Sequence, residues 1–519
     1  MAGTAGVRLA PVTRGKMALG VCTLALAVPA GAWGAGELGQ KAGTAGCVSE
    51  TGSGGVCQDG VALDGVDAIR VSPDGRNAYT GAFAGIGGVA IFDREPTTGA
   101  LAQKPGTSGC VASSGSDCKP GVRLSSVVDV AVSPDGLNVY AVSLFGEALL
   151  SFDRDQTTGE LTQKAGPAGC TTETAVAGCT DGTALKLASG VAVSHDGLNV
   201  YVASQGSDAV AIFDRAAGGV LTQKAGPAGC VSETGDGGTC QDGKALVKPL
   251  KVVAAAGGDN GDVYVASSGN SPLDRGAVAI FDRGVMGGLS QKALTDGCVS
   301  DDGTGGACQD GRGLEAVHGL AVSPDGANVY AAAIRGDAVS VFDRDDEGAL
   351  TQKAGPAGCI SETGTGGDCQ DGVALDAAQA VATSPDGKQV YVGAGSSIVG
   401  ESNAVSSFER DPATGELTQK PGPAGCASET GTGGACQDVF GLDAVQAVAV
   451  SPDSENLYTA ANFSDAVAIF DLGPPPLTGG PTPADVVPPV VSDFSLTRRR
   501  FRVGRRSTPL VARDRKSVV

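Results

Sequence analysis

The chain has 519 residues, a formal net charge of −20 and a pI near 4.5. A phosphate backbone would repel a chain this acidic, so we expect no nucleic-acid partner. The acidity is instead consistent with bound cations or with solubility outside the cell.

The N-terminal segment, residues 1–35, has the layout of a secretory signal peptide. Arg8, Arg14 and Lys16 precede an apolar run at 17–29, and small residues follow that run. The run is shorter than the roughly 20 apolar residues that span a bilayer. We therefore predict an exported, extracellular protein with no membrane span after the signal is removed.

One pattern recurs seven times between residues 36 and 472. Each copy is an apolar run ending in Ser-Pro-Asp-Gly, then Asn-Val-Tyr, Val-Ala-Ile-Phe-Asp-Arg and Leu-Thr-Gln-Lys, at a spacing of about 60 residues. In the third copy this pattern predicts four strands, at 190–193, 199–203, 209–214 and 220–224. Helical periodicity is absent over ten or more positions, so we expect an all-β fold.

Aromatic residues occupy the same two places in every repeat. All seven tyrosines fall on the second predicted strand, and seven of the thirteen phenylalanines fall on the third. Large rings beside many small residues fit the space between stacked sheets. The tyrosines are Tyr79, Tyr140, Tyr201, Tyr264, Tyr330, Tyr391 and Tyr458, and the phenylalanines are Phe92, Phe152, Phe213, Phe281, Phe342, Phe408 and Phe470.

Seven four-stranded repeats predict a seven-bladed β-propeller with four antiparallel strands per blade, because a closed ring protects its strand edges. The pattern opens with a lone fourth strand at 37–41, and its last copy stops after a third strand at Leu472. We therefore expect the N-terminal strand to close the last blade. The repeated Asp-Arg pairs, such as Asp93 and Arg94, are expected to make turn and inter-blade contacts.

The repeats resemble the bacterial lactonase-like seven-bladed propellers, which include 6-phosphogluconolactonase-like and carboxymuconate cyclase-like proteins. The shared wording, Val-Ala-Val-Ser-Pro-Asp-Gly followed by Asn-Val-Tyr-Val-Ala, occurs with small changes at 191–203 and 448–460. The resemblance covers residues 37–472 and implies the propeller fold. It implies activity only weakly, because the shared residues belong to turns and core.

Members of that family with known chemistry combine His, Glu and Arg at the mouth of the axial channel. Candidate partners exist here, but their spacing selects no constellation, and the family's catalytic set has no residue-by-residue counterpart. The available residues are Arg70, Arg123, Arg335, Glu147 and Glu315.

Cysteine spacing predicts one disulfide in every repeat. Cys22 lies within the signal, and the other fourteen cysteines form seven local pairs. Closing each loop is worth roughly 2 to 3 kcal/mol in the chain-entropy model. Zinc would need four thiolates from two loops and leaves one loop over, so no metal site is expected. The predicted pairs are Cys47 with Cys57, Cys110 with Cys118, Cys170 with Cys179, Cys230 with Cys240, Cys298 with Cys308, Cys359 with Cys369, and Cys426 with Cys436.

One position at the predicted channel mouth varies from repeat to repeat, five residues before each turn serine. It holds Asp67, Val128, Ser189, Leu250, His318, Gln379 and Gln446. Variation on a constant scaffold is how repeat proteins build sites, so Asp67, Ser189, Gln379 and Gln446 are predicted to bind a ligand.

His318 is the best candidate for acid or base chemistry, with Arg335 as a group that could stabilise an oxyanion. A hydrogen-bonded structural role for His318 is the commoner outcome for such a residue. The other histidine, His195, falls in a turn at the opposite end of its strand, about 20 Å away at roughly 3.3 Å per residue.

We weigh two functions. The favoured one is a non-catalytic extracellular binding or scaffold protein, monomeric, with an unknown extracellular ligand or protein as its partner. The alternative is a lactone hydrolase or cycloisomerase acting at the channel mouth. No cofactor is expected, although calcium could bind the Gly-rich acidic loops that begin at Ser232, Ser361 and Ser428.

The C-terminal residues change in character. A Pro-rich linker is predicted at 473–491, followed by a basic tail at 492–519. The tail resembles the first strand of a β-sandwich domain in a truncated gene. The alternative is a disordered basic terminus.

Overall fold

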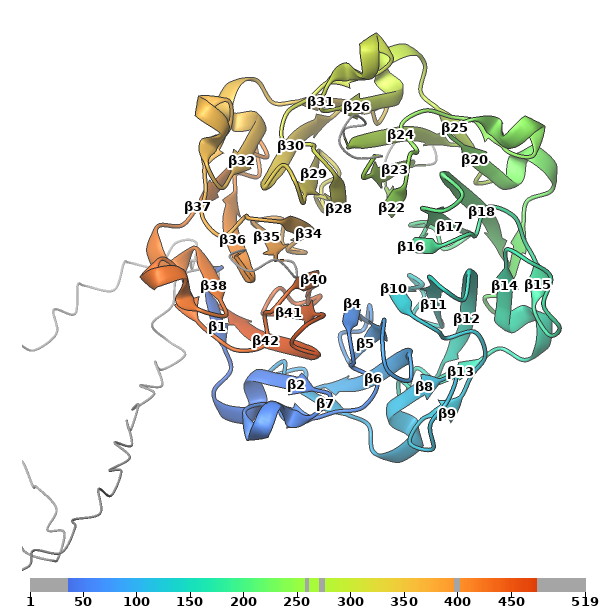
Figure 1. Ribbon diagram of the computed structural model, residues 1–519, viewed down its shortest axis with the longest axis horizontal. Coiled ribbons are helices and arrows are strands. Elements are labelled where there is room, and N and C mark those ends of the chain that lie inside the picture. The colour runs from blue at the N-terminus through green and yellow to red at the C-terminus, as the bar shows by residue number, and fades with distance from the viewer. Residues whose placement is uncertain (1–35, 257–260, 270–275, 396–401, 474–519) are drawn as a thin grey trace, which may run out of the picture. The chain divides into compact units, whose positions relative to one another are not determined.

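The computed structural model describes residues 36–256, 261–269, 276–395 and 402–473, which form seven sheets around a central axis (Figure 1). The predicted all-β, seven-bladed propeller is therefore confirmed. Within these residues, no helix has the length and apolar character needed to cross a bilayer. The predictions for 1–35 and 492–519, and for the linker beyond Gly473, lie outside the described residues.

Each blade begins with three antiparallel strands, which follow one another in order outward from the axis. The second strands are buried along their whole length, because both faces of each blade pack against neighbouring blades. The inner strands of blades 1 to 7 are β4 (Val66–Val71), β10 (Val127–Val132), β16 (Ala188–Val193), β22 (Pro249–Ala255), β28 (Val317–Val322), β34 (Ala378–Thr383) and β40 (Val445–Val450). The second strands are β5 (Asn77–Ala82), β11 (Asn138–Ser143), β17 (Asn199–Ser204), β23 (Asp262–Ser267), β29 (Asn328–Ala333), β35 (Gln389–Ala394) and β41 (Asn456–Ala461). The third strands are β6 (Gly88–Arg94), β12 (Ala148–Arg154), β18 (Ala209–Arg215), β24 (Ala277–Arg283), β30 (Ala338–Arg344), β36 (Ala404–Arg410) and β42 (Ala466–Leu472).

The outer part of each blade is more complex than one fourth strand. Two three-residue strands pair with the third strand in succession, and a two-residue strand adds in parallel at the edge. A 3-10 turn separates the two pieces, and it ends on a glycine because a Cβ at Gly229 would lie 2.3 Å from the carbonyl oxygen of Lys224. The four strands predicted for each blade are therefore observed as six strand segments.

The first outer pieces are β1 (Leu38–Gln40), β7 (Leu101–Gln103), β13 (Leu161–Gln163), β19 (Leu221–Gln223), β25 (Leu289–Gln291), β31 (Leu350–Gln352) and β37 (Leu417–Gln419). The second pieces are β2 (Cys47–Ser49), β8 (Cys110–Ala112), β14 (Cys170–Thr172), β20 (Cys230–Ser232), β26 (Cys298–Ser300), β32 (Cys359–Ser361) and β38 (Cys426–Ser428). The parallel edge strands are β3 (Gln58–Asp59), β9 (Lys119–Pro120), β15 (Thr180–Asp181), β21 (Gln241–Asp242), β27 (Gln309–Asp310), β33 (Gln370–Asp371) and β39 (Gln437–Asp438). The 3-10 turns between pieces are η1 (Gly43–Gly46), η3 (Gly106–Gly109), η4 (Gly166–Gly169), η5 (Gly226–Gly229), η7 (Leu294–Gly297), η9 (Gly355–Gly358) and η11 (Gly422–Ala424), and those in the disulfide loops are η2 (Gly52–Gly55), η6 (Gly235–Gly238), η8 (Gly303–Gly306), η10 (Gly364–Gly367) and η12 (Gly431–Gly434).

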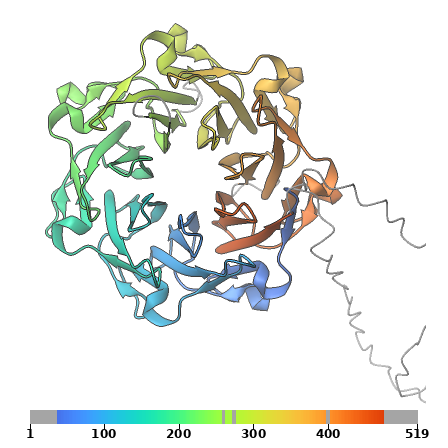
Figure 2. The same cartoon turned by 180° about the vertical axis from the view of Figure 1, so that it is seen from behind.

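The N-terminal strands complete blade 7, as predicted. β1 pairs with β42 through Leu38 opposite Leu472, and β2 pairs with the same strand through Cys47 opposite Ala468. Figures 1 and 2 show these first strands lying against the last ones from both sides of the ring. The ring is therefore closed by residues from the two ends of the repeat region.

A cluster of buried polar groups joins neighbouring blades. Arg154 of blade 2 donates from Nε to the hydroxyl of Tyr79 in blade 1 at 2.6 Å, and from Nη2 to Asp74 and Asn77 at 2.8 and 2.7 Å. The Tyr79 hydroxyl in turn donates to the carbonyl of Gly159 at 2.8 Å. We call this arrangement the Arg–Tyr cluster. Its pairs are Arg94 with Tyr458, Arg154 with Tyr79, Arg215 with Tyr140, Arg283 with Tyr201, Arg344 with Tyr264, and Arg410 with Tyr330.

The interface between blades 6 and 7 lacks this cluster. Leu472 stands where the other third strands end in arginine, so no guanidinium reaches the Tyr391 hydroxyl. Within the described residues, that hydroxyl and Gln389 Oε1 are buried without a hydrogen-bond partner. Burial raises the pKa of Tyr391 well above its ordinary value. The expectation that the Asp-Arg pairs serve the blades is thus met at six interfaces.

All seven predicted disulfides are present, each spanning 8 to 10 residues, so the predicted local pairing is confirmed in every repeat. They join Cys47 with Cys57, Cys110 with Cys118, Cys170 with Cys179, Cys230 with Cys240, Cys298 with Cys308, Cys359 with Cys369, and Cys426 with Cys436.

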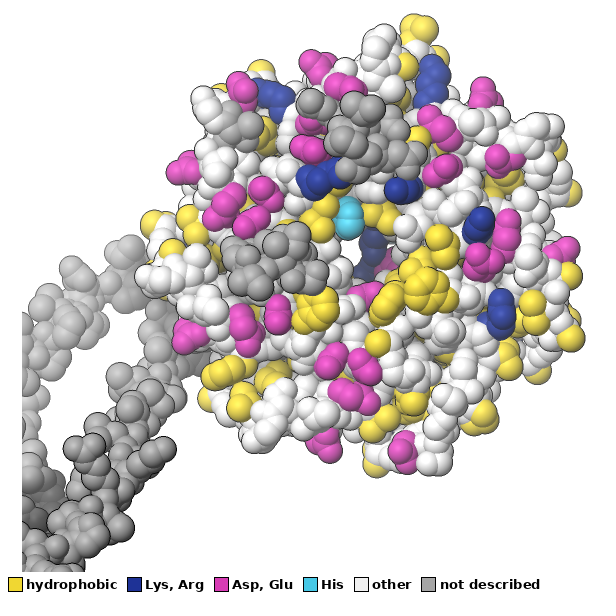
Figure 3. Space-filling view, viewed as in Figure 1, with side chains coloured by type: hydrophobic (Ala, Val, Ile, Leu, Met, Phe, Trp, Pro, Cys, Tyr) yellow, Lys and Arg dark blue, Asp and Glu magenta, His cyan; other side chains and the backbone are white. Residues whose placement is uncertain are grey.

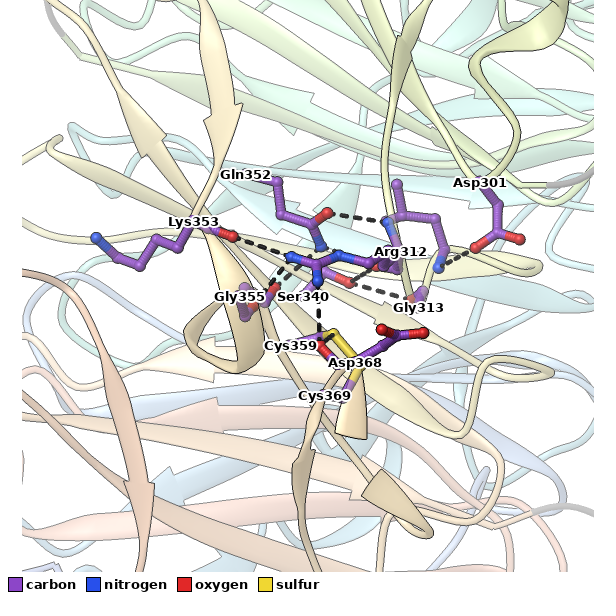
Figure 4. Close-up of a disulfide and its surroundings, with 12 residues drawn as sticks. Asp301, Arg312, Gly313, Ser340, Gln352, Lys353, Gly355, Cys359, Asp368 and Cys369 are labelled. Carbon is purple, nitrogen blue, oxygen red and sulfur yellow. Dashed lines mark hydrogen bonds between the residues drawn. A yellow bond between two sulfur atoms is a disulfide. The ribbon is translucent and has the colours of Figure 1, made fainter. Parts of the chain in front are cut away.

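The disulfide loop of blade 5 contacts the linker that arrives from blade 4. Figure 4 shows Cys359–Cys369 with Arg312, whose guanidinium donates to the carbonyls of Asp368 and Gly355 at 3.2 and 3.0 Å. Gln352 accepts from the Arg312 backbone N–H at 2.9 Å and donates to its carbonyl at 2.8 Å. The outer strand therefore binds the linker that arrives from the preceding blade.

Candidate functional site

Each of the seven variable residues at the mouth is the extra residue of a β-bulge. The pairing of the inner and second strands skips it in every blade, for example between Val317 and Gly319, so that His318 has no direct partner. Two residues earlier the backbone is left-handed, with φ of 58° at Ala316. Bulges re-aim a side chain without disturbing the ladder beyond it. This geometry explains how one position can vary freely on a constant scaffold.

An axial cavity of about 480 Å³ opens among the inner strands. His318, Gln379 and Gln446, the ring residues of blades 5, 6 and 7, line it together. Asp67, Ser189 and Arg335 do not belong to its lining. Figure 3 shows the opening on this face, with a histidine at its rim and basic and acidic side chains inside it.

His318 is half-buried at the cavity wall, and burial, with a smaller effect from the positive charge of Arg335, lowers its pKa to about 4. The imidazole is therefore neutral at neutral pH. In the described part of the chain no hydrogen bond orients the ring, so it lacks the partner that would fix a general base in one tautomer.

Arg335 lies in the loop between β29 and β30 and is partly exposed. Its Nε is 3.4 Å from Glu315 Oε1, and its backbone N–H donates to the Glu315 carbonyl at 3.1 Å. The guanidinium is thus near His318 but is held by an acid outside the cavity.

Asp67 is separated from this group, in blade 1. Its carboxylate accepts a hydrogen bond from the Asn462 side chain of blade 7. Burial raises the pKa of Asp67 to about 7, against the opposing effect of that hydrogen bond. It is therefore a carboxyl group that titrates near neutrality.

Two other predicted binding residues are engaged by the backbone. Ser189 Oγ lies 2.8 Å from the Pro249 carbonyl of blade 4 and 3.1 Å from that of Ala203. Gln379 donates from its side chain to the Gly395 carbonyl. These residues hold strands together, which leaves Gln446 as the ring amide with no hydrogen bond to described residues.

Asp129 and Lys251, which were not among the predicted site residues, lie deeper on blades 2 and 4 together with Arg70 of blade 1, one of the arginines considered for the channel mouth. Asp129 Oδ1 accepts from Arg70 Nη2 at 3.1 Å, and Asp129 Oδ2 accepts from Lys251 Nζ at 2.8 Å. Lys251 of blade 4 spans blade 3 to reach Asp129. Blade 3 has Gly190 at the equivalent strand position, where a Cβ would lie 2.6 Å from the Leu250 carbonyl oxygen. Arg70 and Lys251 line the cavity.

The pKa values of this cluster reflect its burial. Burial raises the pKa of Asp129, but Lys251, Arg70 and a hydrogen bond from the Val191 N–H together bring it below its ordinary value. Burial and repulsion by Arg70 lower the pKa of Lys251 to about 8. A signal for the cluster exists in the sequence, since Asp129 and Lys251 occupy the repeat position that is alanine or glycine in the other five blades.

Aromatic side chains gather on another part of the mouth. Phe83 and Phe145, in the loops after β5 and β11, have ring centroids 5.6 Å apart, and Phe145 is 62% exposed. Phe463 occupies the corresponding loop of blade 7 and is 54% exposed. We call these three residues the aromatic sector; it lies on three consecutive blades.

The acidic loops considered for calcium use their repeated acid for backbone contacts. Glu50 accepts from the Leu63 N–H at 2.6 Å, and Glu362 does the same for Leu375. Among the described residues, no group of three or more His, Cys, Asp or Glu side chains could hold a metal ion. Calcium binding by these loops stays a prediction.

Neither a protein-family model nor a curated protein matches this chain. Solved structures with a similar fold include a candidate 6-phosphogluconolactonase from Bacteroides fragilis, with 17% identity and a TM-score of 0.44, covering 68% of this chain and 82% of that one. Another, from Bacteroides uniformis, has 15% identity and a TM-score of 0.44, and covers 68% of this chain and 83% of that one. Hydrazine synthase from Kuenenia stuttgartiensis matches with 16% identity, TM-score 0.43 and coverage of 79% and 97%. At this similarity the comparisons assign neither an activity nor a ligand.

Proposed function

We propose that this chain is an exported, lactonase-like β-propeller that binds a small ligand at the mouth of its axial cavity without converting it. The repeat wording supports the lactonase-like assignment, and seven local disulfides support export, because such cross-links persist in oxidising compartments. The observation that carries the proposal is the ring of bulge residues, which differ among blades while the strands below them repeat.

The cavity has the features of a small-molecule site. Its volume of about 480 Å³ lies within the range for ligand pockets, and its lining combines Val and Ala side chains with polar groups that make up more of the exposed surface. The aromatic sector adds exposed rings beside the opening, where an apolar or planar part of a ligand could pack. Binding is favoured over turnover because no described acid lines the cavity to orient His318.

The second candidate is a lactone hydrolase or cycloisomerase with His318 as general base. One observation favours it: the lowered pKa of His318 keeps the imidazole free to accept a proton at neutral pH. In this reading Arg335 would stabilise the developing oxyanion, and it would have to leave Glu315 to do so.

One panel separates the two functions. The purified full chain is assayed with sugar and aromatic lactones for turnover, and with a broad set of small charged and neutral metabolites for binding by thermal shift. If the chain is a binding protein, a ligand should raise its melting temperature without being converted. Gln446→Trp, which fills the cavity, should abolish this ligand-induced stabilisation. Turnover lost in His318→Ala but kept in His195→Ala, the exposed control, would establish the enzyme instead. Absence of binding by every compound contradicts the proposal.

A further inference from the structure

We infer that Arg70 and Lys251 form an anion site inside the axial cavity, and that it takes the carboxylate of a small organic acid. The inference rests on the proposed binding function, because it assigns the chemistry of one part of the same cavity. It begins from the charge balance of three residues: two cations share a single carboxylate, Asp129.

Asp129 has no remaining capacity to neutralise its partners. One of its oxygens accepts from Arg70, and the other accepts from both Lys251 and the Val191 backbone N–H at 3.0 Å. The side chain is almost completely buried. The cluster therefore holds one unbalanced positive charge on two partly buried cations, Arg70 and Lys251, whose side chains are 29% and 22% exposed, and an anion in the cavity would pair with it.

The unbalanced charge faces the cavity. Arg70 and Lys251 belong to its lining, whereas no Asp or Glu does among the described residues. The only hydrogen bond from Lys251 Nζ to a described residue goes to Asp129, so two of its three N–H groups stay available. The Arg70 guanidinium uses Nη1 for the Ile69 carbonyl and Nη2 for Asp129, which leaves further donors for a ligand.

The rest of the lining indicates which anion fits. A single unbalanced charge matches a monoanion better than a phosphate dianion. The lining residues are largely Val and Ala, the surface exposed to the cavity is more polar than apolar, and His318 and Gln446 lie among the lining residues as neutral polar groups. A small monocarboxylate meets these conditions.

Titration calorimetry of the full chain at pH 7 tests the site with sodium benzoate as the probe and benzamide as its uncharged isostere. We expect benzoate to bind at least tenfold more tightly than benzamide, and inorganic phosphate to bind more weakly than benzoate. Lys251→Met, which balances the cluster charge, should lose benzoate affinity at least tenfold. Asp129→Asn keeps an oxygen for the Val191 N–H and removes the competing charge, so its affinity should rise severalfold.

Equal binding of benzoate and benzamide, no benzoate binding at 10 mM, or an unchanged affinity in Lys251→Met would overturn the assignment. If Lys251→Met does not fold by circular dichroism, Arg70→Met makes the same charge change from a partly exposed position. Binding of phosphate in preference to benzoate also contradicts a carboxylate site. The two proposals fail in different ways. If no compound of the wider panel binds, the proposed binding function is wrong. If neutral compounds bind but benzoate shows no preference, only the anion site is wrong.

Discussion

Arg94 in blade 1 donates from Nε to the hydroxyl of Tyr458 in blade 7 at 2.7 Å. The two residues are 364 positions apart, yet their contact repeats the one between Arg154 and Tyr79 of consecutive blades. The interface between the last and first blades is therefore bonded like the interfaces inside the chain. The interface that lacks this contact lies one step earlier, between blades 6 and 7, where Leu472 replaces the arginine.

The first prediction compares the same substitution at two interfaces. Tyr458→Phe leaves the buried Arg94 Nε–H without its hydrogen-bond acceptor, so the free energy of unfolding should fall by about 1 to 3 kcal/mol. Tyr391→Phe removes a buried hydroxyl that has no partner, so it should be neutral or stabilising by up to about 1 kcal/mol. Guanidinium denaturation of both variants measures the difference. Equal losses in both would contradict the role given to the Arg–Tyr cluster.

A second prediction restores the missing cluster. Leu472 pairs with Leu38 as Arg410 pairs with Leu417, so Leu472→Arg places a guanidinium beside the Tyr391 hydroxyl and Gln389 Oε1. We expect a stability gain of about 1 to 2 kcal/mol from these charge-assisted bonds. Thermal unfolding of Leu472→Arg, with Leu472→Met as the apolar control, measures it. The gain should shrink in the Leu472→Arg/Tyr391→Phe double variant, and a loss of stability would show that apolar burial at this position matters more.

The third prediction concerns the pKa of Asp67. The folded protein keeps its proton up to about pH 7, while the unfolded chain releases it near 3.8. Raising the pH from 4 to 7 therefore withdraws a proton from the unfolded state only, and the free energy of unfolding falls. Asp67→Asn should remove this loss and be more stable than the parent by about 1 to 3 kcal/mol at pH 8, with no difference at pH 3.5. Denaturation across this range measures it, with the exposed Asp242→Asn as the control.

The fourth prediction is that His318 gives the free energy of unfolding the opposite pH dependence. Its folded-state pKa is about 4, against 6.5 for the free side chain, so acidification from pH 6.5 to 4 protonates the unfolded chain alone. Stability is then lost as the pH falls through this window. His318→Gln should lose less stability than the parent between pH 6.5 and 4.5, whereas His195→Gln should follow the parent. Parallel curves for all three proteins would mean that burial does not hold His318 neutral.

The fifth prediction tests the disulfides at two places with equal loop lengths. Cys47–Cys57 lies in the closing blade and Cys230–Cys240 in blade 3, and both span 10 residues. Replacing either pair by serine should cost about 2 to 3 kcal/mol if loop entropy sets the effect. Chemical denaturation of the two double variants compares them. A much larger cost for Cys47→Ser/Cys57→Ser would show that ring closure depends on this cross-link.

Sequence columns predicted much of the fold because each blade repeats the same residues in the same places. Tyr79 and Phe92, with their equivalents, marked the second and third strands, and the lone opening strand predicted the closure of blade 7. The broken outer strand escaped prediction, because the tight turn ending at Gly229 depends on an approach to the Lys224 carbonyl that the residue pattern does not express.

The candidate site was predicted in part for a physical reason. The ring residues of blades 5 to 7 share one column, and the structure brings His318, Gln379 and Gln446 to one cavity. The contacts of Asp129 join four blades, so they depend on how neighbouring sheets are placed relative to one another, which no single repeat encodes. Charged residues in a column of alanine and glycine were the available signal.

Ring closure and the disulfides place opposite demands on the order of folding. Lys41 and Asp471, which form an ion pair in the closing blade, are 430 residues apart, so this blade waits until nearly all of the described chain has been synthesised. Each cystine joins cysteines at most 10 residues apart and can form as soon as its own repeat emerges. Since each disulfide needs only its own repeat, oxidation can precede ring closure. A partly folded chain can then hold its correct disulfides while its N-terminal strands are still unpaired with the last blade.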